Sequence, residues 1–364
     1  MIPVKKHLRD LRRVRNTMTR SGYLRLDKNE NVIGFEEEFV EKLRQEITSE
    51  FLTTYPEVGP LYQKLARWIG CNEENIYITA GSDAAIKSVF EVFVEPGDTV
   101  ALLSPTYAMF YVYAQMFQAC LIEIRFNKGL FISVEDILKI IHEQKPKLIC
   151  IANPNSPTGT ILAQEDLWEI IDVASKQNTI VLLDEAYYLY YPVISIDRIY
   201  DHPNLVVTRS FSKAMGLASA RLGFVVAHSD TAKYLQAVRP MYETNAFAVR
   251  FAELVLDNMH LVEKNLEAVR KGKEYLEKEL EGLGIPYFKS YANFVLIDVG
   301  SIEKSVELGN ALHQKKILIG SGFKDELLQN CIRVTIGNVE QMKFFLERFG
   351  EILQQVSPDP RTLR

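Results

Sequence analysis

The chain has 364 residues, of which 47% are hydrophobic and 24% charged, and its formal net charge is −5. A chain of this length can bury a large core and usually forms two domains or one large one. The acidic balance argues against general nucleic-acid binding, which favours a basic surface, and no apolar run reaches the roughly 18 residues that a membrane span requires.

The N-terminus, up to Arg15, is locally basic and lacks the apolar core of a secretory signal, so we expect a solvated arm or helix there. The four cysteines are scattered and include no C-x-x-C pair. This usage is typical of reduced thiols in a cytoplasmic protein.

Short apolar segments alternate with helical patterns through the middle of the chain. Strands are predicted at residues 75–80, 99–105, 147–154, 179–187, 204–212 and 222–228, and helices at 81–94, 106–117 and 163–177. Continuous Val/Ile/Leu runs between helices are typical of strands buried on both faces. We therefore predict an α/β fold with a mostly parallel sheet and helices on both faces.

The pattern changes at about residue 250. A long charged helix at 260–284 is followed by strand-like segments at 293–299 and 331–337, which indicates a smaller α+β domain. We expect residues 1–45 to form an N-terminal arm and part of this small domain, residues 46–250 the large domain, and residues 251–364 the C-terminal small domain.

Polar motifs follow the predicted strands of the central region. "GSDAA" (81–85) begins a helix whose first N–H groups could hold a phosphate. Small residues at a strand-to-helix turn are, however, more often found without a ligand. Tyr107 could stack on a flat ring or pack in the core, and "ANPNSPTG" (152–159) forms a rigid loop. Because ligands of open α/β sheets bind at the carboxyl ends of strands, these motifs predict one shared site.

Two charged side chains stand in apolar surroundings. Asp184 ends a run of four apolar residues, where a carboxylate needs either a salt bridge or a ligand cation such as a protonated pyridine nitrogen. Lys213 lies in "TRSFSKAMGLASARLGF" (208–224), among small and hydroxylated residues. Desolvation and a nearby cation favour the neutral amine that attacks a carbonyl.

The neighbours of Lys213 can bind an anion. Ser210 and Ser212 offer hydroxyl groups and Arg221 a charge-assisted contact, while Arg333, on an alternating strand, also needs a carboxylate or phosphate partner. A phosphate cradle, a stacking ring, a buried acid and a reactive lysine together are what pyridoxal 5′-phosphate requires. The constellation calls for no metal ion.

The ordered motifs "LDKNEN" (26–31), "TTYPEVG" (53–59), "GSDAA", "PTYAMF", "NPNSPTG", "DEAYYLY", "SFSKAMGLASARLGF" and "IRVTIG" span nearly the whole chain. With them the sequence resembles the fold-type I, class I/II aminotransferases, and most of all the histidinol-phosphate aminotransferase group. Such enzymes exchange amino groups between a donor such as glutamate and a keto or aldehyde acceptor.

The resemblance implies a role for each motif residue. Lys213 would form the Schiff base with the cofactor, Asp184 would pair with the ring nitrogen, and Tyr187 would hydrogen-bond the phenolic oxygen. Tyr107 would stack on the ring. The phosphate would be held by Ser82 and Asp83 through their backbone, and by Ser210, Ser212 and Arg221 through their side chains. The substrate would be bound by Arg333 and Asn29.

The resemblance also implies a homodimer with shared active sites. Tyr55 would reach the phosphate of the cofactor in the neighbouring subunit.

The sequence departs from the family at two site positions. Ser156 stands where the family usually has Asn, so either Asn155 or Ser156 contacts the phenolic oxygen. Gly320 stands where histidinol-phosphate aminotransferases carry an arginine that helps bind the substrate phosphate, and the nearest basic residue after it is Lys324. We therefore expect the acceptor to be a compound other than the keto form of histidinol phosphate.

Three alternatives remain. A decarboxylase of an O-phospho amino acid would use the same cofactor site, although it too would want a second arginine. A sensor module of a transcription regulator would need a DNA-binding domain ahead of "LDKNEN", where we expect too few residues. A non-enzymatic protein on this fold would have no need of Lys213.

Overall fold

The structure is a computed structural model that describes residues 3–9, 11, 18–191 and 195–356. The described part of the expected N-terminal arm contains one 3-10 turn, η1 (Lys6–Leu8). Its basic residues Arg12, Arg13 and Arg15 lie outside the described residues.

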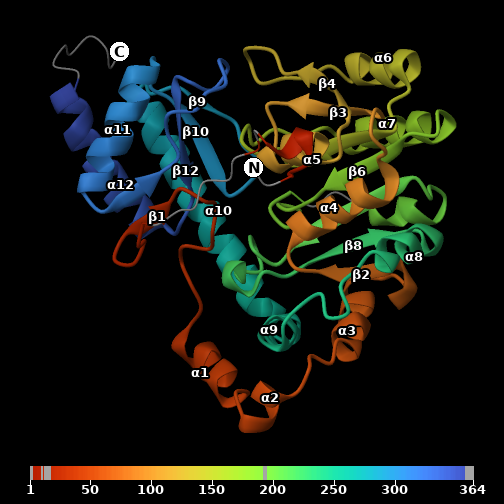
Figure 1. Ribbon diagram of the computed structural model, residues 1–364. Helices are drawn as coiled ribbons and strands as arrows, with labels where there is room; N and C mark the ends of the chain where they lie inside the picture. Colours follow the sequence, from red (N-terminus) through yellow and green to blue (C-terminus); the bar gives the residue numbers. More distant parts are fainter. Residues whose placement is uncertain (1–2, 10, 12–17, 192–194, 357–364) are drawn as a thin grey trace.

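A seven-stranded sheet forms the larger layer of the molecule (Figure 1). Its strands are, in spatial order, β2 (Ile76–Thr79), β8 (Gly223–Ala227), β7 (Leu205–Ser210), β6 (Ile180–Asp184), β5 (Leu148–Ala152), β3 (Thr99–Ser104) and β4 (Cys120–Arg125). β8 runs antiparallel to β2 and β7, and the other neighbouring pairs are parallel. The predicted mostly parallel sheet is confirmed.

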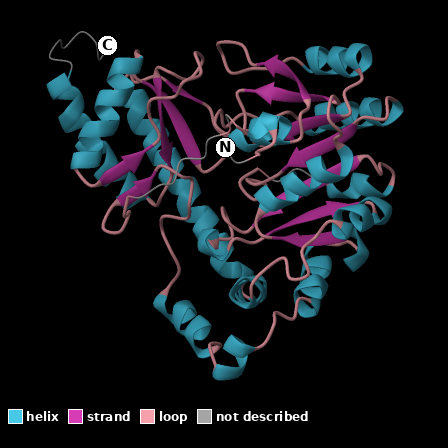
Figure 2. Ribbon diagram, viewed as in Figure 1, coloured by secondary structure: helices cyan, strands magenta, loops and turns pink. Residues whose placement is uncertain are grey.

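Helices cover both faces of this sheet, as Figure 2 shows. One face packs against α3 (Gly59–Ile69), α6 (Val134–Gln144), α7 (Gln164–Lys176) and α9 (Ala246–Asp257). The other packs against α4 (Ser82–Phe93), α5 (Ala108–Met116) and α8 (Ser229–Ala237). Successive residues of β5 alternate between the two cores, which is why its sequence is apolar throughout.

Two smaller sheets lie beside the large one. β9 (Tyr287–Phe288), β10 (Phe294–Asp298) and β12 (Cys331–Thr335) form an antiparallel sheet. β1 (Leu24–Leu26) pairs in parallel with β11 (Ile317–Ile319), so the N-terminal segment joins the C-terminal part of the chain. They share a third core with α10 (Met259–Gly282), α11 (Ile302–Gln314) and α12 (Val339–Val356).

The long helix α10 connects the two parts. Val262 belongs to the core under the large sheet, whereas Val269 and Leu276 belong to the core of the small sheets. The short helices α1 (Glu37–Gln45) and α2 (Ser49–Thr53) lie at the bottom of Figure 1, away from the sheets. The predicted domain boundaries at residues 45 and 250 stay a prediction.

Candidate active site

A cavity of about 570 Å³ lies where the strands β5, β6 and β7 end. Residues far apart in the chain line it, and those that follow β3, β5, β6 and β7 meet there because the carboxyl ends of parallel strands lie at one edge of the sheet. The predicted site residues that line it are Asn29, Ser82, Asp83, Tyr107, Asp184, Tyr187, Ser210, Ser212, Lys213, Arg221 and Arg333. Of the residues named in the sequence analysis for a cofactor or substrate, only Asn155 and Tyr55 do not line it.

The first residues of α4 form one wall of the cavity, and this wall can bind an anion. The helix begins after Gly81, and no side chain caps its first N–H groups. Gly81 has φ +83°, and a Cβ there would lie 2.7 Å from Nη2 of Arg221. A glycine is therefore required for this guanidinium to approach the helix N-terminus, where backbone donors and the helix dipole favour a phosphate.

Ser210 and Ser212 lie next to Arg221. Nη1 of Arg221 donates to Oγ of Ser212 at 3.1 Å, and Oγ of Ser210 accepts from the backbone N–H of Ser212 at 3.0 Å. Arg221 itself has a left-handed backbone, with φ +54°. Two hydroxyl groups, a guanidinium and a helix N-terminus thus converge on one corner of the cavity, and this donor set fits a phosphate group.

Asp184 ends β6 and is 5% exposed. Oγ1 of Thr208, on the neighbouring strand β7, donates to its carboxylate at 2.9 Å. Burial raises the pKa of Asp184 from its ordinary value of 3.8 to about 6, although the Thr208 hydrogen bond opposes the shift. No lysine, arginine or histidine among the described residues forms an ion pair with Asp184, so its carboxylate lacks the salt bridge that was one explanation of its burial.

Lys213 and Tyr187 lie close together in the cavity wall. Nζ of Lys213 donates to the backbone carbonyl of Lys28 at 2.9 Å and lies 5.5 Å from the centre of the Tyr187 ring. Burial acts to raise the pKa of Tyr187, but the positive charges of Lys213 and Arg333 act the other way, and the net effect lowers this pKa. The site therefore favours negative charge on a phenolic oxygen.

Residues 27–29 touch three of the predicted site side chains in succession. The carbonyl of Asp27 accepts from Nη2 of Arg333 at 2.9 Å, that of Lys28 accepts from Lys213, and Nδ2 of Asn29 donates to the Tyr187 hydroxyl at 2.8 Å. This segment was recognised in the sequence only through the motif "LDKNEN", with Asn29 as its predicted site residue.

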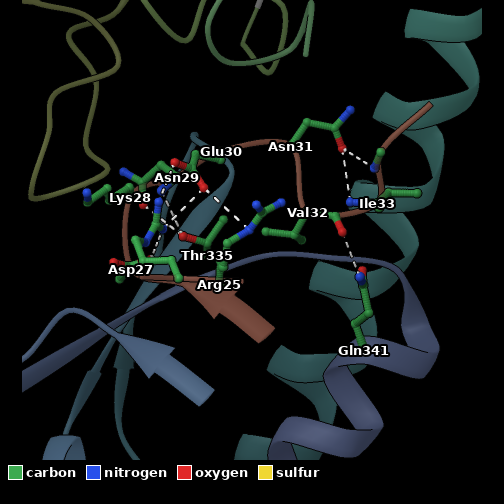
Figure 3. A network of polar contacts seen from close by, with 12 residues as sticks. Arg25, Asp27, Lys28, Asn29, Glu30, Asn31, Val32, Ile33, Thr335 and Gln341 are labelled. Carbon is green, nitrogen blue, oxygen red and sulfur yellow. Dashed lines mark hydrogen bonds and ion pairs between the residues drawn. The ribbon is translucent and has the colours of Figure 1, made fainter. Parts of the chain in front are cut away.

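Residues of β12 and α12 hold the segment in place, as Figure 3 shows. The Asn29 backbone N–H donates to Oγ1 of Thr335, and the Thr335 hydroxyl donates to Oδ1 of Asn29. Nε2 of Gln341 donates to the carbonyl of Val32 at 2.8 Å. Outside the cavity, Nη1 of Arg20 donates to Glu30 at 2.7 Å.

Arg333 lies on β12, next to Gly320. The two residues exchange backbone hydrogen bonds of 2.9 and 2.7 Å. Its guanidinium centre lies 5.4 Å from the Phe294 ring centre and 5.9 Å from that of Phe323, and burial lowers the pKa of the side chain. Nε of Arg333 is buried without a hydrogen-bond partner among the described residues, so it fits an incoming anion.

Asn155 and Ser156, the two alternatives of the sequence analysis, point to different places. Asn155 is buried behind the cavity, where it bonds to Thr106, Thr158 and the carbonyl of Pro105. Ser156 lines the cavity, and its side chain helps to lower the pKa of Tyr187. The structure therefore favours Ser156 for a contact with the cofactor.

Tyr55 lies outside this cavity, in the segment after α2. It is 69% exposed and stacks on Tyr242, with ring centres 4.1 Å apart and planes 3° apart. Tyr107 immediately precedes α5, and its hydroxyl lies 3.4 Å from Oδ1 of Asp83. Burial raises the pKa of Tyr107, so this hydroxyl stays neutral at physiological pH.

Sequence reasoning missed Lys28 and Phe323, which also line the cavity. Lys28 is adjacent to Asn29 in "LDKNEN", so the motif could have suggested it. Phe323 lies in the loop between β11 and β12, and no sequence pattern marks it.

The chain belongs to the class I and II aminotransferase family, whose family model matches residues 22–349. It is therefore an aminotransferase that depends on pyridoxal phosphate, which confirms the resemblance and the predicted cofactor. Among the curated relatives, the histidinol-phosphate aminotransferase of Thermoanaerobacter pseudethanolicus is 32% identical over 332 residues, which are 90% of this chain and 93% of that protein.

Solved structures share the fold. The histidinol-phosphate aminotransferase from Sinorhizobium meliloti, in complex with pyridoxal-5′-phosphate, has a TM-score of 0.84 at 23% identity and covers 92% of this chain and 91% of its own. The L-threonine-O-3-phosphate decarboxylase from Porphyromonas gingivalis has a TM-score of 0.76 at 21% identity and covers 91% and 99%. No helix among the described residues is both long and apolar enough to cross a membrane.

Proposed function

We propose that this aminotransferase moves an amino group between glutamate, or a similar donor, and a small keto or aldehyde acceptor, with Lys213, Asp184 and Tyr187 as its catalytic residues. The observation that carries the proposal is a buried carboxylate without a cationic partner in the same cavity as a lysine. Asp184 supplies a place for a protonated ring nitrogen, and Lys213 supplies the amine.

The cofactor would be held at both ends. Ser82 and Asp83, at the N-terminus of α4, would bind the phosphate through their backbone, and Ser210, Ser212 and Arg221 through their side chains. Asp184 would pair with the ring nitrogen, Tyr107 would lie against the ring, and Ser156 and Tyr187 would hydrogen-bond the phenolic oxygen. When bound, pyridoxal phosphate supplies an aldehyde that captures amines and a ring that withdraws electrons.

Two residues of the chain handle different protons in the reaction. The Asp184 carboxylate would keep a proton on the ring nitrogen, and this would matter most when negative charge develops at the substrate Cα. The Nζ of Lys213 would take the proton from the substrate Cα and later give it back. Between these steps the carbonyl of Lys28 can hold the Lys213 amine, as it does in the structure.

Arg333 binds and orients the substrate anion. Its unpartnered Nε and its position beside Tyr187 place a carboxylate near the reacting amine. Asn29 lines the same cavity and keeps the Tyr187 ring in place through its side chain, so it would serve the substrate mainly by orienting its neighbours.

We further propose a homodimer in the cytoplasm. Tyr55 is a large exposed ring outside its own cavity, which supports its predicted role at the phosphate of the neighbouring subunit. Cys71, Cys120, Cys150 and Cys331 are free thiols, which fits a reducing compartment.

The substrate is proposed to differ from that of the curated relatives. A phosphate ester at Arg333 would profit from a second buried cation, but Gly320, beside Arg333, has no side chain, and the exposed Lys324 does not line the cavity. Lys28 lines the cavity but is exposed to solvent. Each missing charge-assisted hydrogen bond costs about 1.5–3 kcal/mol, or roughly one to two orders of magnitude in affinity. The same argument weighs against a decarboxylase of a phosphorylated amino acid.

A half-reaction screen tests the proposal. The holoenzyme is mixed with single amines, and the loss of the visible absorbance of the bound cofactor is followed by stopped flow. Glutamate should convert the cofactor to its aminated form. Conversion by histidinol phosphate at a rate well above that of every other amine would overturn the substrate argument, and carbon dioxide released from O-phosphothreonine would establish the decarboxylase instead.

A further inference from the structure

We infer that Arg20 is a positioning residue that holds the carboxylate of Asp27 away from Arg333 and so leaves Arg333 open to the substrate anion. The inference rests on the proposed function, because that function makes Arg333 the anion site. Arg333 lines the cavity, whereas Arg20 and Asp27 lie outside it. Arg20 precedes β1 in the chain, and Asp27 directly follows that strand.

Arg20 binds two carboxylates at once. Its Nη1 donates to Oε1 of Glu30 at 2.7 Å and its Nη2 to Oε2 at 3.2 Å, and Nη2 also donates to Oδ1 of Asp27. The three side chains are between 15% and 22% exposed. Because a forked contact of this kind is charge-assisted and directional, it fixes the side-chain rotamers of both acids.

The backbone next to Asp27 is held independently of Arg20. Asn29, two residues further on, has a left-handed backbone with φ +56°, which is uncommon outside glycine. Its N–H donates to Oγ1 of Thr335 at 3.0 Å, and its carbonyl accepts from Nδ2 of Asn293 at 3.1 Å (Figure 3). Loss of the Arg20 side chain should therefore free the Asp27 carboxylate while the backbone stays in place.

Asp27 and Arg333 are already close together. The backbone carbonyl of Asp27 accepts from Nη2 of Arg333 at 2.9 Å, and this carbonyl and the carboxylate leave the same Cα. Burial lowers the pKa of Arg333, whereas Tyr187 and the carboxylate of Asp27 act to raise it. Among the described residues, that carboxylate forms an ion pair with Arg20 and none with Arg333. A change of rotamer at Asp27 can carry it from one arginine toward the other.

Arg333 has a donor ready for such an anion. Its Nε is buried and has no hydrogen-bond partner in the part of the chain that the structure describes. A carboxylate released from Arg20 would compete for this guanidinium as part of the same chain, without the loss of translational freedom that a substrate bears. It would act as an internal inhibitor at the anion site. Arg20 prevents this, because it offers the Asp27 carboxylate a second cation outside the cavity.

The test compares the holoenzyme with Arg20→Gln, Arg20→Gln/Asp27→Asn and Arg20→Gln/Glu30→Gln. Calorimetry gives the Kd of succinate, a dicarboxylate without an amine to react, and the half-reaction with glutamate gives its KM and maximal rate. Arg20→Gln should raise the succinate Kd and the glutamate KM about 10- to 100-fold, with the maximal rate changed less than about threefold. Removal of the competing carboxylate in Arg20→Gln/Asp27→Asn should return both constants to within about threefold of the wild type.

The second double variant separates this mechanism from a change in net charge. Arg20→Gln/Glu30→Gln has the same net charge as Arg20→Gln/Asp27→Asn but leaves Asp27 ionised, so its succinate Kd should stay as high as that of Arg20→Gln. Arg270→Gln is the matched control, because Arg270 also binds two carboxylates but is 56% exposed on α10. It should bind succinate as the wild type does.

An unchanged succinate Kd in Arg20→Gln, or equal losses in the two double variants, would overturn the inference, and so would a wild type that binds no succinate. Should Arg20→Gln fail to fold, Arg20→Lys keeps the charge without the forked contact. Its succinate Kd should rise about 3- to 10-fold, and an unchanged value would count equally against the inference. A wild type that passes the succinate tests but converts neither glutamate nor any other amine would refute the proposed function alone.

Discussion

Replacing Asp184 by Asn should stabilise the cofactor-free protein while disabling the enzyme. The amide is nearly isosteric and keeps an oxygen to accept the Thr208 hydroxyl, so the change mainly removes a buried charge. Burial raises the pKa of Asp184 from 3.8 to about 6. A difference of about 2 in pKa between unfolded and folded chains corresponds to about 3 kcal/mol of folding free energy.

The sign of the effect follows from the direction of the shift. Because the folded state binds the proton more tightly, the cost of the buried charge is fully present above about pH 6 and is lost as the pH falls toward 4. At pH 8 the variant should therefore be more stable by up to about 3 kcal/mol. With an unfolding entropy of about 2.1 cal/mol/K per residue, this raises Tm by about 4 °C for a chain of this length.

The assay is thermal unfolding of the cofactor-free proteins, followed by circular dichroism at one heating rate at pH 8 and at pH 4.5. Asp201→Asn, at an exposed turn, is the control and should melt with the wild type at both pH values. With cofactor bound, Asp184→Asn should retain the cofactor but lose kcat by at least about 100-fold. A variant that melts at or below the wild type at pH 8, or one that keeps near wild-type kcat, would refute the reasoning.

Three further predictions concern the cofactor site and assembly. The wild type should be yellow, with a visible band that borohydride removes, and Lys213→Ala should lack that band and all transamination; a wild type that stays colourless after incubation with pyridoxal phosphate would contradict the assignment. Arg221→Lys keeps the charge but loses the planar contact with Ser212, so titration of the cofactor should show a Kd about 10- to 100-fold higher, whereas an unchanged Kd would remove Arg221 from the phosphate site. Tyr55→Phe should weaken cofactor binding in a protein that still sediments as a dimer, and a fully active wild-type monomer would disprove shared active sites.

The sequence by itself determined six of the seven strands of the large sheet and most of the residues expected at one site. The apolar runs that end at Asp184 and Ser210 indicated buried parallel strands, because a strand covered on both faces needs no polar alternation. The end of each apolar run also showed which polar residues follow the strand. In a parallel sheet these carboxyl ends lie at the same edge. For this reason the order of residues along the chain was enough to assign Asp184, Lys213 and Arg221 to one cavity.

The tertiary structure decided which side chains from distant segments of the chain meet in the cavity. It turned Ser156 rather than Asn155 toward the cavity, because Asn155 bonds to Thr106 and Pro105 on the neighbouring β3–α5 loop. It brought Lys28 to Lys213, 185 positions away in the chain. It also placed the Phe323 ring next to Gly320 and Arg333 in the cavity wall. Hydrophobic periodicity reports which face of an element is buried, but the partner on that face is selected only when separate elements pack together.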